Sequence, residues 1–216
     1  MMKSMTIALR SVLIAATLMI ASTGANAASV TFIGVLNSVN RNGDYAGFYD
    51  LTIDGSAILG LCDSIDATVN PPSTWTADIL SYTDIQSGSI GRYNNPSTAA
   101  TLIKYSQAGW LYSQLALLLP NDYSGQADIQ EAIWKIMVPS YVPAGGGVAA
   151  YYSAATGGTH DAFDWSAVMR VVTANPLVVD GRQVQEFLIP TVPVPAAAWL
   201  FGSALGLLGL GRRRAS

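Results

Sequence analysis

Residues 29–36, Ser-Val-Thr-Phe-Ile-Gly-Val-Leu, alternate roughly between apolar and small or polar side chains. A period of two residues is typical of a β-strand with one buried face. A turn-rich stretch follows at residues 40–44, and residues 47–55 and 57–62 form two further strand patterns joined by an Asp-Gly turn. The domain is therefore predicted to begin with three short strands joined by tight turns.

A helical period replaces the strand period in the middle of the chain. Residues 98–118 carry apolar side chains near the 3.6-residue spacing of a helix. A second helix is predicted at 128–137, with Asp128 as its N-cap and Glu131 three residues later. Pro139 ends this helix. The centre of the domain is therefore expected to be helical.

The rest of the domain has weaker patterns. Residues 75–93 are ambiguous between strand and loop, and short helices are expected through 151–152 and over 164–172. Residues 183–189 predict a final strand. The order of elements predicts one α+β domain over residues 28–190, with antiparallel strands at both ends and a helical central part.

Composition limits the function classes. The 216-residue chain is 50% hydrophobic and 12% charged, a balance that disordered chains do not have. Its formal net charge is −3, and the basic residues form no stripe, so no nucleic-acid partner is expected. One Cys and one His argue against a disulfide framework and against zinc or His-based metal sites. We therefore expect no metal and no cofactor.

The N-terminal residues 1–27 have the three parts of a secretory signal peptide: a basic start, an apolar run, and small residues at Ala25-Asn26-Ala27. Cleavage by signal peptidase would start the exported chain near Ala28. A buried N-terminal helix is the alternative, which the short apolar run and the A-x-A site disfavour.

The C-terminal residues 191–216 contain an uncharged apolar run at 196–210, which predicts a short transmembrane helix of marginal length. The run lies between a proline motif, Val192-Pro193-Val194-Pro195, and an arginine cluster, Arg212, Arg213 and Arg214. The whole segment resembles the VPLPA-type variant of the bacterial PEP-CTERM sorting signals. This resemblance implies cleavage by an exosortase-type peptidase and an association with exopolysaccharide production. Pro-Glu-Pro is absent, which leaves open the sorting enzyme, and a plain membrane anchor is the alternative.

The lone cysteine, Cys62, ends a predicted strand, and its simplest interpretation is a small buried hydrophobe. In an exported chain, a lone cysteine is free, intermolecular or chemically committed. Leu61-Cys62, the helix around Ala108-Gly109-Trp110-Leu111-Tyr112 and the helix start Ile129-Gln130-Glu131-Ala132-Ile133-Trp134 follow in order. Together they resemble the Cys–Gln thioester domains of bacterial surface adhesins, over residues 45–140. The resemblance implies that Cys62 supplies the thiol and Gln130 the acyl carbon.

The chemistry of such a bond places demands on its surroundings. A thiol that displaces ammonia from a glutamine amide stores an activated acyl group. Near-attack placement supplies about 7–11 kcal/mol of such a barrier. Gln130 is expected in the first turn of its helix, where the helix N-terminus would stabilise the developing oxyanion. Trp110, Tyr112 and Trp134 are the candidates for excluding water. Capture of an amine by the thioester happens once, so no enzyme and no catalytic residues are expected.

Other candidates have a simpler explanation beside the functional one. His160-Asp161 is half of a hydrolase-type arrangement, but no G-x-S-x-G motif accompanies it. Asp63 and Asp66, close to Cys62, fit general acids and turn caps equally well. The tyrosines and tryptophans could stack on sugars, but packing is their default role. No calcium-loop motif is present.

These observations predict a protein of the cell surface or extracellular matrix that passes through an inner-membrane-anchored intermediate. Its partners would be signal peptidase, an exosortase-type peptidase, the membrane through the C-terminal helix, and an amine-bearing surface ligand or an exopolysaccharide. The alternative function is a non-covalent exopolysaccharide or biofilm-matrix protein in which Cys62 is merely buried. A secreted hydrolase is a third class, and it would need His160 beside a Ser or Asp in a cleft.

Overall fold

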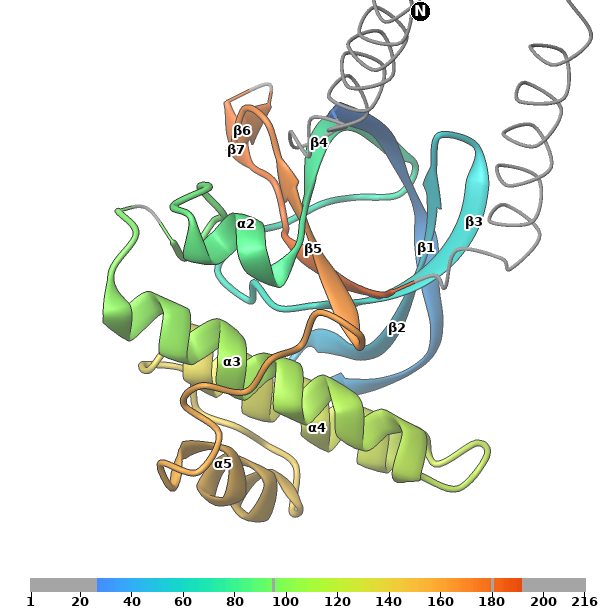
Figure 1. The fold of residues 1–216 in the computed structure, drawn as a ribbon. Coiled ribbons are helices and arrows are strands. Elements are labelled where there is room, and N and C mark those ends of the chain that lie inside the picture. Colours follow the sequence, from blue (N-terminus) through green and yellow to red (C-terminus); the bar gives the residue numbers. More distant parts are fainter. Residues whose placement is uncertain (1–26, 95, 180, 192–216) are drawn as a thin grey trace, which may run out of the picture.

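The centre of the molecule is a closed barrel of six antiparallel strands in the computed structural model, which describes residues 27–94, 96–179 and 181–191 (Figure 1). The order around the barrel is β1, β2, β3, β8, β5, β4. These strands are β1 (Ala27–Arg41), β2 (Asp44–Ile53), β3 (Ser56–Cys62), β4 (Ser73–Leu80), β5 (Met169–Ala174) and β8 (Phe187–Pro190). A separate two-stranded sheet is formed by β6 (Val178–Val179) and β7 (Arg182–Gln183).

Two tight turns set the register of the first three strands. Asn42 and Gly43 both have positive φ (56° and 99°), and so do Asp54 and Gly55 (49° and 81°). Two-residue turns with both residues at positive φ match the right-handed twist of the strands that they join. The Asn-Gly and Asp-Gly pairs therefore form the β1–β2 and β2–β3 hairpins, which confirms these predicted turns.

A bulge interrupts the β1–β2 ladder at Gly47. The register shifts between residues 36 and 39 of β1, so that two β1 residues oppose Gly47. Gly47 has a φ of 145°, and a Cβ on it would lie only 2.9 Å from the Ser38 Cα. Glycine tolerates both the conformation and the close approach. Bulges of this kind re-aim the backbone beside them.

Side chains fill the interior of the barrel. The rings of Phe32, Tyr49, Trp75 and Phe187 pack together, with contacting centroids 5.5 to 6.4 Å apart. Cys62 belongs to the same buried cluster. Inward-facing residues alternate with outward-facing ones along each strand, so a barrel of this size is a packed core.

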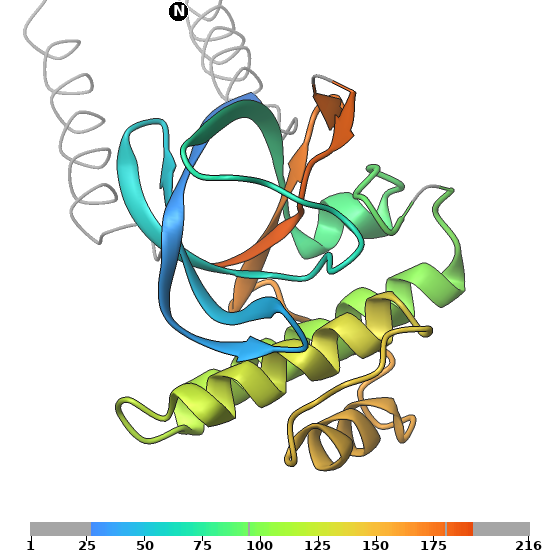
Figure 2. The same ribbon diagram turned by 180° about the vertical axis from the view of Figure 1, so that it is seen from behind.

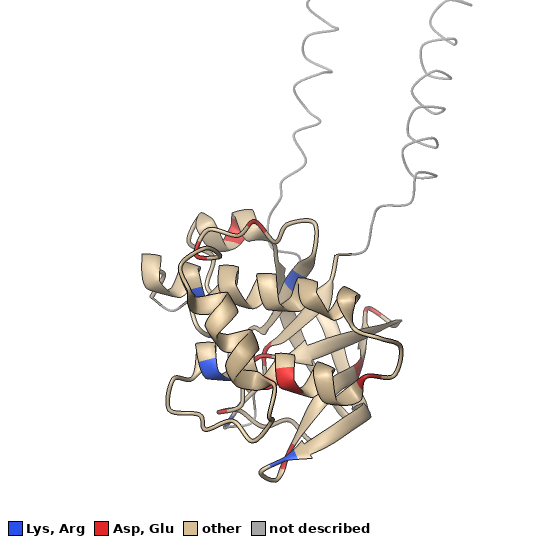
Figure 3. Cartoon of the chain, turned by 90° about the horizontal axis from the view of Figure 1, so that it is seen from below, with Lys and Arg blue, Asp and Glu red and all other residues tan. Residues whose placement is uncertain are grey.

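Helices cover one side of the barrel (Figures 1 and 2). The long helices α3 and α4 lie side by side against the barrel, and α4 contacts both β1 and β2. Charged residues appear in Figure 3 as short blue and red segments scattered over the cartoon. The helical elements are α2 (Tyr82–Gln86), α3 (Ala99–Gln114), the 3₁₀ turn η1 (Leu115–Leu117), α4 (Tyr123–Met137) and α5 (Val148–Thr156).

The closed barrel corrects the predicted fold class. The prediction of an α+β domain with separate antiparallel strands at its two ends is wrong, because β5 and β8 belong to the same closed sheet as β1 to β4. The helix predicted over 164–172 is wrong as well, because residues 169–174 form β5, whose Val171 and Val172 are fully buried. Pairing on both sides overrides the local pattern there.

The fold prediction also included a short C-terminal transmembrane helix, and the structure does not support it. None of the helices in the described ranges combines the length and the apolar character that crossing a bilayer requires. The predicted span and the signal peptide fall in residues 192–216 and 1–26, which lie outside the described residues.

Candidate functional site

Cys62 is the last residue of β3 and lies fully buried in the barrel core. Its partner across the ladder is Phe187 of β8. The sulfur accepts the backbone N–H of Ser64 at 3.4 Å, and the thiol donates to the Ser64 carbonyl oxygen at 3.5 Å. The backbone of Ser64, just after β3, therefore holds the thiol in place.

Gln130 lies in the middle of α4 and is fully buried. The helix begins at Tyr123, and its N-cap is Asp122, whose side chain accepts the Gly125 N–H at 2.9 Å. The expected N-cap at Asp128 and the expected first-turn position of Gln130 are therefore both wrong. Because unpaired N–H groups occur only in the first turn, the N-terminus of α4 cannot supply the oxyanion donor.

The Gln130 amide nevertheless lies against Cys62, although 68 residues separate them. Its nitrogen donates to the Cys62 carbonyl oxygen at 3.0 Å, and its oxygen accepts the Gly47 N–H at 2.6 Å. The indole N–H of Trp134, one turn further along α4, donates to the same Cys62 carbonyl at 2.8 Å. The amide is thus oriented at both of its polar atoms by strand backbone.

The electrostatics of this site favour neutral groups. Burial, and to a lesser degree the nearby Asp63 carboxyl, raises the pKa of the Cys62 thiol to about 12. Burial also raises the pKa of Tyr49, and the adjacent Cys62 and Asp44 charges add to that shift. At neutral pH the thiol and the phenol therefore stay protonated.

The structure brings one of the three expected shielding residues to the pair. Trp134 is 1% exposed and packs edge-on against Tyr141, with centroids 5.5 Å apart. Tyr112 belongs to the other core cluster and the half-buried Trp110 packs against it, whereas Cys62 lies in the barrel cluster. Trp110 stacks there on His160 at 4.1 Å. Only Trp134 therefore lies where it can keep water from the Cys62 carbonyl.

Gly47 is the site residue that the sequence interpretation missed. Its N–H is the only donor to the Gln130 side-chain oxygen among the described hydrogen bonds, and it lies at the bulge. An isolated glycine inside a strand pattern often marks a bulge or a close backbone approach. That signal was present in the Gly-Phe-Tyr-Asp stretch at residues 47–50.

A buried carboxyl pair directly follows the cysteine. Asp63 and Glu186 are both fully buried. The Glu186 carboxylate accepts the Tyr105 hydroxyl at 2.6 Å and the Arg92 backbone N–H at 2.7 Å, whereas the Asp63 oxygens contact no N–H donor in the described structure. Burial, followed by the charge of Glu186, raises the pKa of Asp63 well above its ordinary value. Asp63 therefore keeps its proton at pH values well above its ordinary pKa.

The remaining candidates form no second constellation. Asp66 accepts the Tyr93 hydroxyl at 2.6 Å near the surface. Asp161 accepts the side-chain amide of Gln107 at 2.7 Å, and no described hydrogen bond joins it to His160. Across the described ranges, no group of three or more His, Cys, Asp or Glu residues could hold a metal ion.

Most of the predicted processing residues fall beyond the described ranges. Ala25, Val192, Pro193, Val194, Pro195, Arg212, Arg213 and Arg214 lie outside the described residues. Ala27 and Ala28 begin β1, where they pair with Asp78 and Ala77 of β4, and Ala28 is buried. A chain that starts at Ala28 would keep nearly all of this ladder.

The site thus combines a thiol, an amide carbon and a backbone N–H donor in a sealed core. These are the nucleophile, the acyl carbon and the oxyanion donor of an acyl transfer. No family model, no curated protein and no solved structure matches this chain. Any functional assignment therefore depends on this geometry and on the sequence.

Proposed function

We propose that this domain stores an internal thioester between the Cys62 sulfur and the side-chain carbon of Gln130. The observation that carries the proposal is the orientation of the buried Gln130 amide, with its oxygen on the Gly47 N–H (2.6 Å) and its nitrogen on the Cys62 carbonyl (3.0 Å). Both polar atoms of the amide are thereby held by strand backbone, and one of them bonds to the Cys62 residue itself. Fixed placement of two reacting groups can supply about 7–11 kcal/mol of a barrier.

Formation of the bond is a balanced displacement. The Cys62 sulfur bonds to the Gln130 carbon, the carbon–nitrogen bond breaks, and the thiol proton leaves with the amide nitrogen as ammonia. Gly47 donates to the oxygen that becomes negative during the attack, as an oxyanion-hole donor does. The raised thiol pKa means that the thiol proton must pass to the nitrogen during the reaction, because a free thiolate is scarce.

Capture is the reverse type of step. A primary amine attacks the Gln130 carbon, the carbon–sulfur bond breaks, and one amine proton returns to Cys62 as its thiol. The product is an amide that joins the domain to its target. Burial of Cys62, Gln130 and Trp134 protects the stored bond from water in the meantime. Each domain acts once, so the protein is a covalent adhesin and not an enzyme.

The same proposal includes export and sorting. The signal peptide, with Ala25 and Ala27 before the cut, and the proline motif at residues 192–195 would route the chain through signal peptidase and an exosortase-type peptidase. The destination is the cell surface or the extracellular matrix, where amine-bearing surfaces are available. N-terminal sequencing and intact mass of the secreted protein test this part, and a chain that retains residues 1–27 would contradict it.

Intact mass of the purified protein tests the thioester. We expect a mass lower than that of the encoded chain by one ammonia. Methylamine should add one methylamine to this form, and hydrolysis should instead add one water and leave a glutamate side chain. Cys62→Ala and Gln130→Ala abolish the deficit, whereas Gln107→Ala, which changes a buried glutamine on α3, leaves it intact. A full mass together with an unmodified Cys62 in freshly purified protein would contradict the proposal.

A non-covalent matrix or polysaccharide-binding protein is the second candidate function. It is favoured by the satisfied state of the Gln130 amide, whose oxygen and nitrogen each have a backbone partner without any covalent bond. In that case Gln130 would be a structural link between α4 and the barrel. The full mass described above, with binding to exopolysaccharide that survives Cys62→Ala, is the result that selects this candidate.

A further inference from the structure

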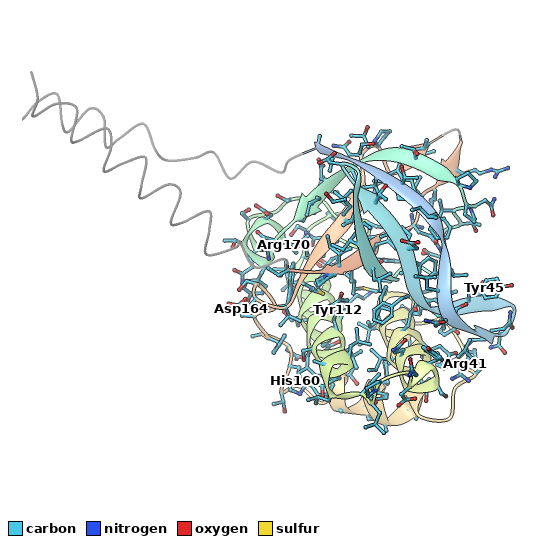
Figure 4. All side chains as sticks on the ribbon, turned by 90° about the vertical axis from the view of Figure 1, so that its right-hand side faces the viewer. Arg41, Tyr45, Tyr112, His160, Asp164 and Arg170 are labelled. Carbon is cyan, nitrogen blue, oxygen red and sulfur yellow. The ribbon has the colours of Figure 1, made fainter. Side chains whose placement is uncertain are left out.

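Arg41, at the end of β1, forms ion pairs with Asp128 and Glu131 of α4, which flank Gln130 in the sequence. Figure 4 shows Arg41 beside α4. Its Nη2 lies 2.8 Å from the Asp128 Oδ1, and its Nε lies 3.3 Å from the Glu131 Oε2. The Arg41 side chain is 15% exposed, and the Glu131 side chain is fully buried. The contact with Asp128 is a hydrogen bond, whereas Arg41 Nε has no hydrogen-bond partner and contacts Glu131 only as an ion pair. A buried guanidinium is costly to desolvate, and the two carboxylates offset part of that cost.

The two carboxylates are held from their other side by the glycine-rich loop. Glu131 accepts the backbone N–H groups of Ala144 (2.7 Å) and Gly145 (2.8 Å), and Asp128 accepts that of Gly147 (3.0 Å). A Cβ on Gly145 or Gly147 would collide with the Asp128 carboxylate. The Tyr141 hydroxyl also donates to Glu131, at 2.8 Å. The acid pair is therefore a fixed anchor on α4.

The acid pair is connected to Gln130 through the β1–β2 hairpin, which carries both Arg41 and Gly47. Arg41 pairs with Asp44 across the β1–β2 turn, and Gly47 follows three residues later on β2. Asn42 adds a hydrogen bond from the turn to the Val142 carbonyl oxygen, at 3.2 Å. Only if the hairpin tip stays on α4 does the Gly47 N–H stay on the Gln130 oxygen.

We propose that Arg41 is the positioning residue of this site: its guanidinium clamps the β1–β2 hairpin onto α4 and thereby fixes and covers the Gln130 amide. The clamp has two consequences for the proposed thioester. Formation requires the fixed amide, so it depends on the clamp. Attack by an amine requires access past Gly47, so a loosened clamp makes any formed thioester react faster.

The first measurement needs no thioester. In a Cys62→Ser chain, in which the thioester cannot form, the Gln130 side-chain amide is followed by NMR hydrogen exchange. We expect Arg41→Gln to speed this exchange by about tenfold or more, as expected when a local opening becomes easier. Arg41→Lys, which keeps the charge but loses the forked geometry, should restore part of the protection.

Arg92→Gln is the matched control. Arg92 is also buried (7% exposed) and also pairs with an aspartate, Asp66, at 3.2 Å, but it contacts the β7–β8 segment through Gln183 and Val184. The Arg92→Gln variant should lower the stability of the fold without changing the hydrogen exchange of the Gln130 side-chain amide. Equal exchange in Arg41→Gln and Arg92→Gln chains of matched stability would overturn the proposal. If Arg41→Gln does not fold, Asp128→Asn, which removes one arm of the clamp, takes its place.

The second measurement depends on the proposed function. In the chain with Cys62 present, Arg41→Gln should lower the fraction of molecules lacking one ammonia and increase the methylamine rate of those that do lack it. A merely structural role would lower the fraction without the faster reaction. If the parent chain shows a full mass, the proposed thioester fails, while the exchange result still decides the role of Arg41.

Discussion

The two sides of the Cys62–Asp63 dipeptide differ in how their buried polar groups are satisfied. On one side, the Gln130 amide and the Trp134 indole share the Cys62 carbonyl, and Gly47 completes the amide. On the other side, the Asp63 carboxyl faces another carboxyl, and no N–H group reaches it in the described structure. Cys62 thus lies in a neutral network whose polar groups have partners, whereas the neighbouring Asp63 lies in an acidic one whose carboxyl oxygens have no N–H donor.

The two networks have different consequences: the amide network fixes geometry, and the carboxyl pair makes stability depend on pH. A fully satisfied network holds its members in one geometry, which is what an acyl transfer needs. A buried carboxyl pair holds a proton that water would remove, so the free energy of folding depends on pH. Each prediction below perturbs one of these networks, or the helix that carries Gln130, and compares the variant with a matched control variant.

Trp134→Ala should have the largest effect, because it empties a buried volume and leaves the Cys62 carbonyl with one donor fewer. Truncation of a buried tryptophan costs about 3–5 kcal/mol. We expect a loss of that size in urea unfolding and rapid labelling of the Cys62 position. Trp110→Ala is the control, since its half-buried ring packs in the helix core and should not expose Cys62. Equal labelling in both variants would contradict the shielding role of Trp134.

Gln130→Leu should lower the free energy of unfolding by less than Trp134→Ala does. The side-chain shape is nearly kept, and only the hydrogen bonds of the amide are lost. The Gly47 N–H is then buried without a partner, which costs about 1–3 kcal/mol. The comparison is made in Cys62→Ser chains, so that no thioester contributes. Gln107→Leu, which loses a bond to the half-buried Asp161, should cost less. A smaller loss for Gln130→Leu than for Gln107→Leu would show that the amide network is not structural.

Local sequence patterns predicted where most strands and helices lie, but they did not predict which strands pair with one another. Residues 29–36, 47–53 and 57–62 all fall within observed strands, and Asp54-Gly55 forms the predicted turn, because alternation and turn residues act over short distances. Barrel closure depends on the pairing of β1 with β4 and of β3 with β8. No single segment encodes such pairings, so the sequence could not predict that the two ends share one sheet.

The candidate site shows the same division. Cys62 and Gln130 were singled out as a pair, and the structure brings them together. Gly47 and Arg41 act through a bulge and an ion pair between distant elements, which a linear motif does not contain. The start of α4 was misplaced because Asp128 looks like an N-cap by spacing, whereas Arg41 and the loop engage its carboxylate.

Asp63→Asn should remove a pH dependence that the amide side lacks. The folded-state pKa of Asp63 is raised, so its stability contribution is complete below its ordinary pKa of 3.8 and is lost as pH rises through the raised value. For one proton, the slope is at most about 1.4 kcal/mol per pH unit. Chemical unfolding from pH 4 upward, at about one-unit steps, measures it. Asp66→Asn, which changes an exposed carboxylate, should keep the wild-type slope; an unchanged slope in Asp63→Asn would contradict the prediction.

Asp122→Ala should have the smallest effect, and it locates the beginning of α4 relative to the site. Loss of a side-chain N-cap costs about 1 kcal/mol, because the Gly125 N–H loses its acceptor. Gln130 lies about two turns further on, so its amide geometry and any thioester yield should be unchanged. Asp128→Ala removes the Arg41 partner instead of a cap, and it should lower both stability and yield. If Asp122→Ala lowers the yield as much as Asp128→Ala does, the helix N-terminus contributes to the chemistry after all, and the role assigned to Gly47 would need revision.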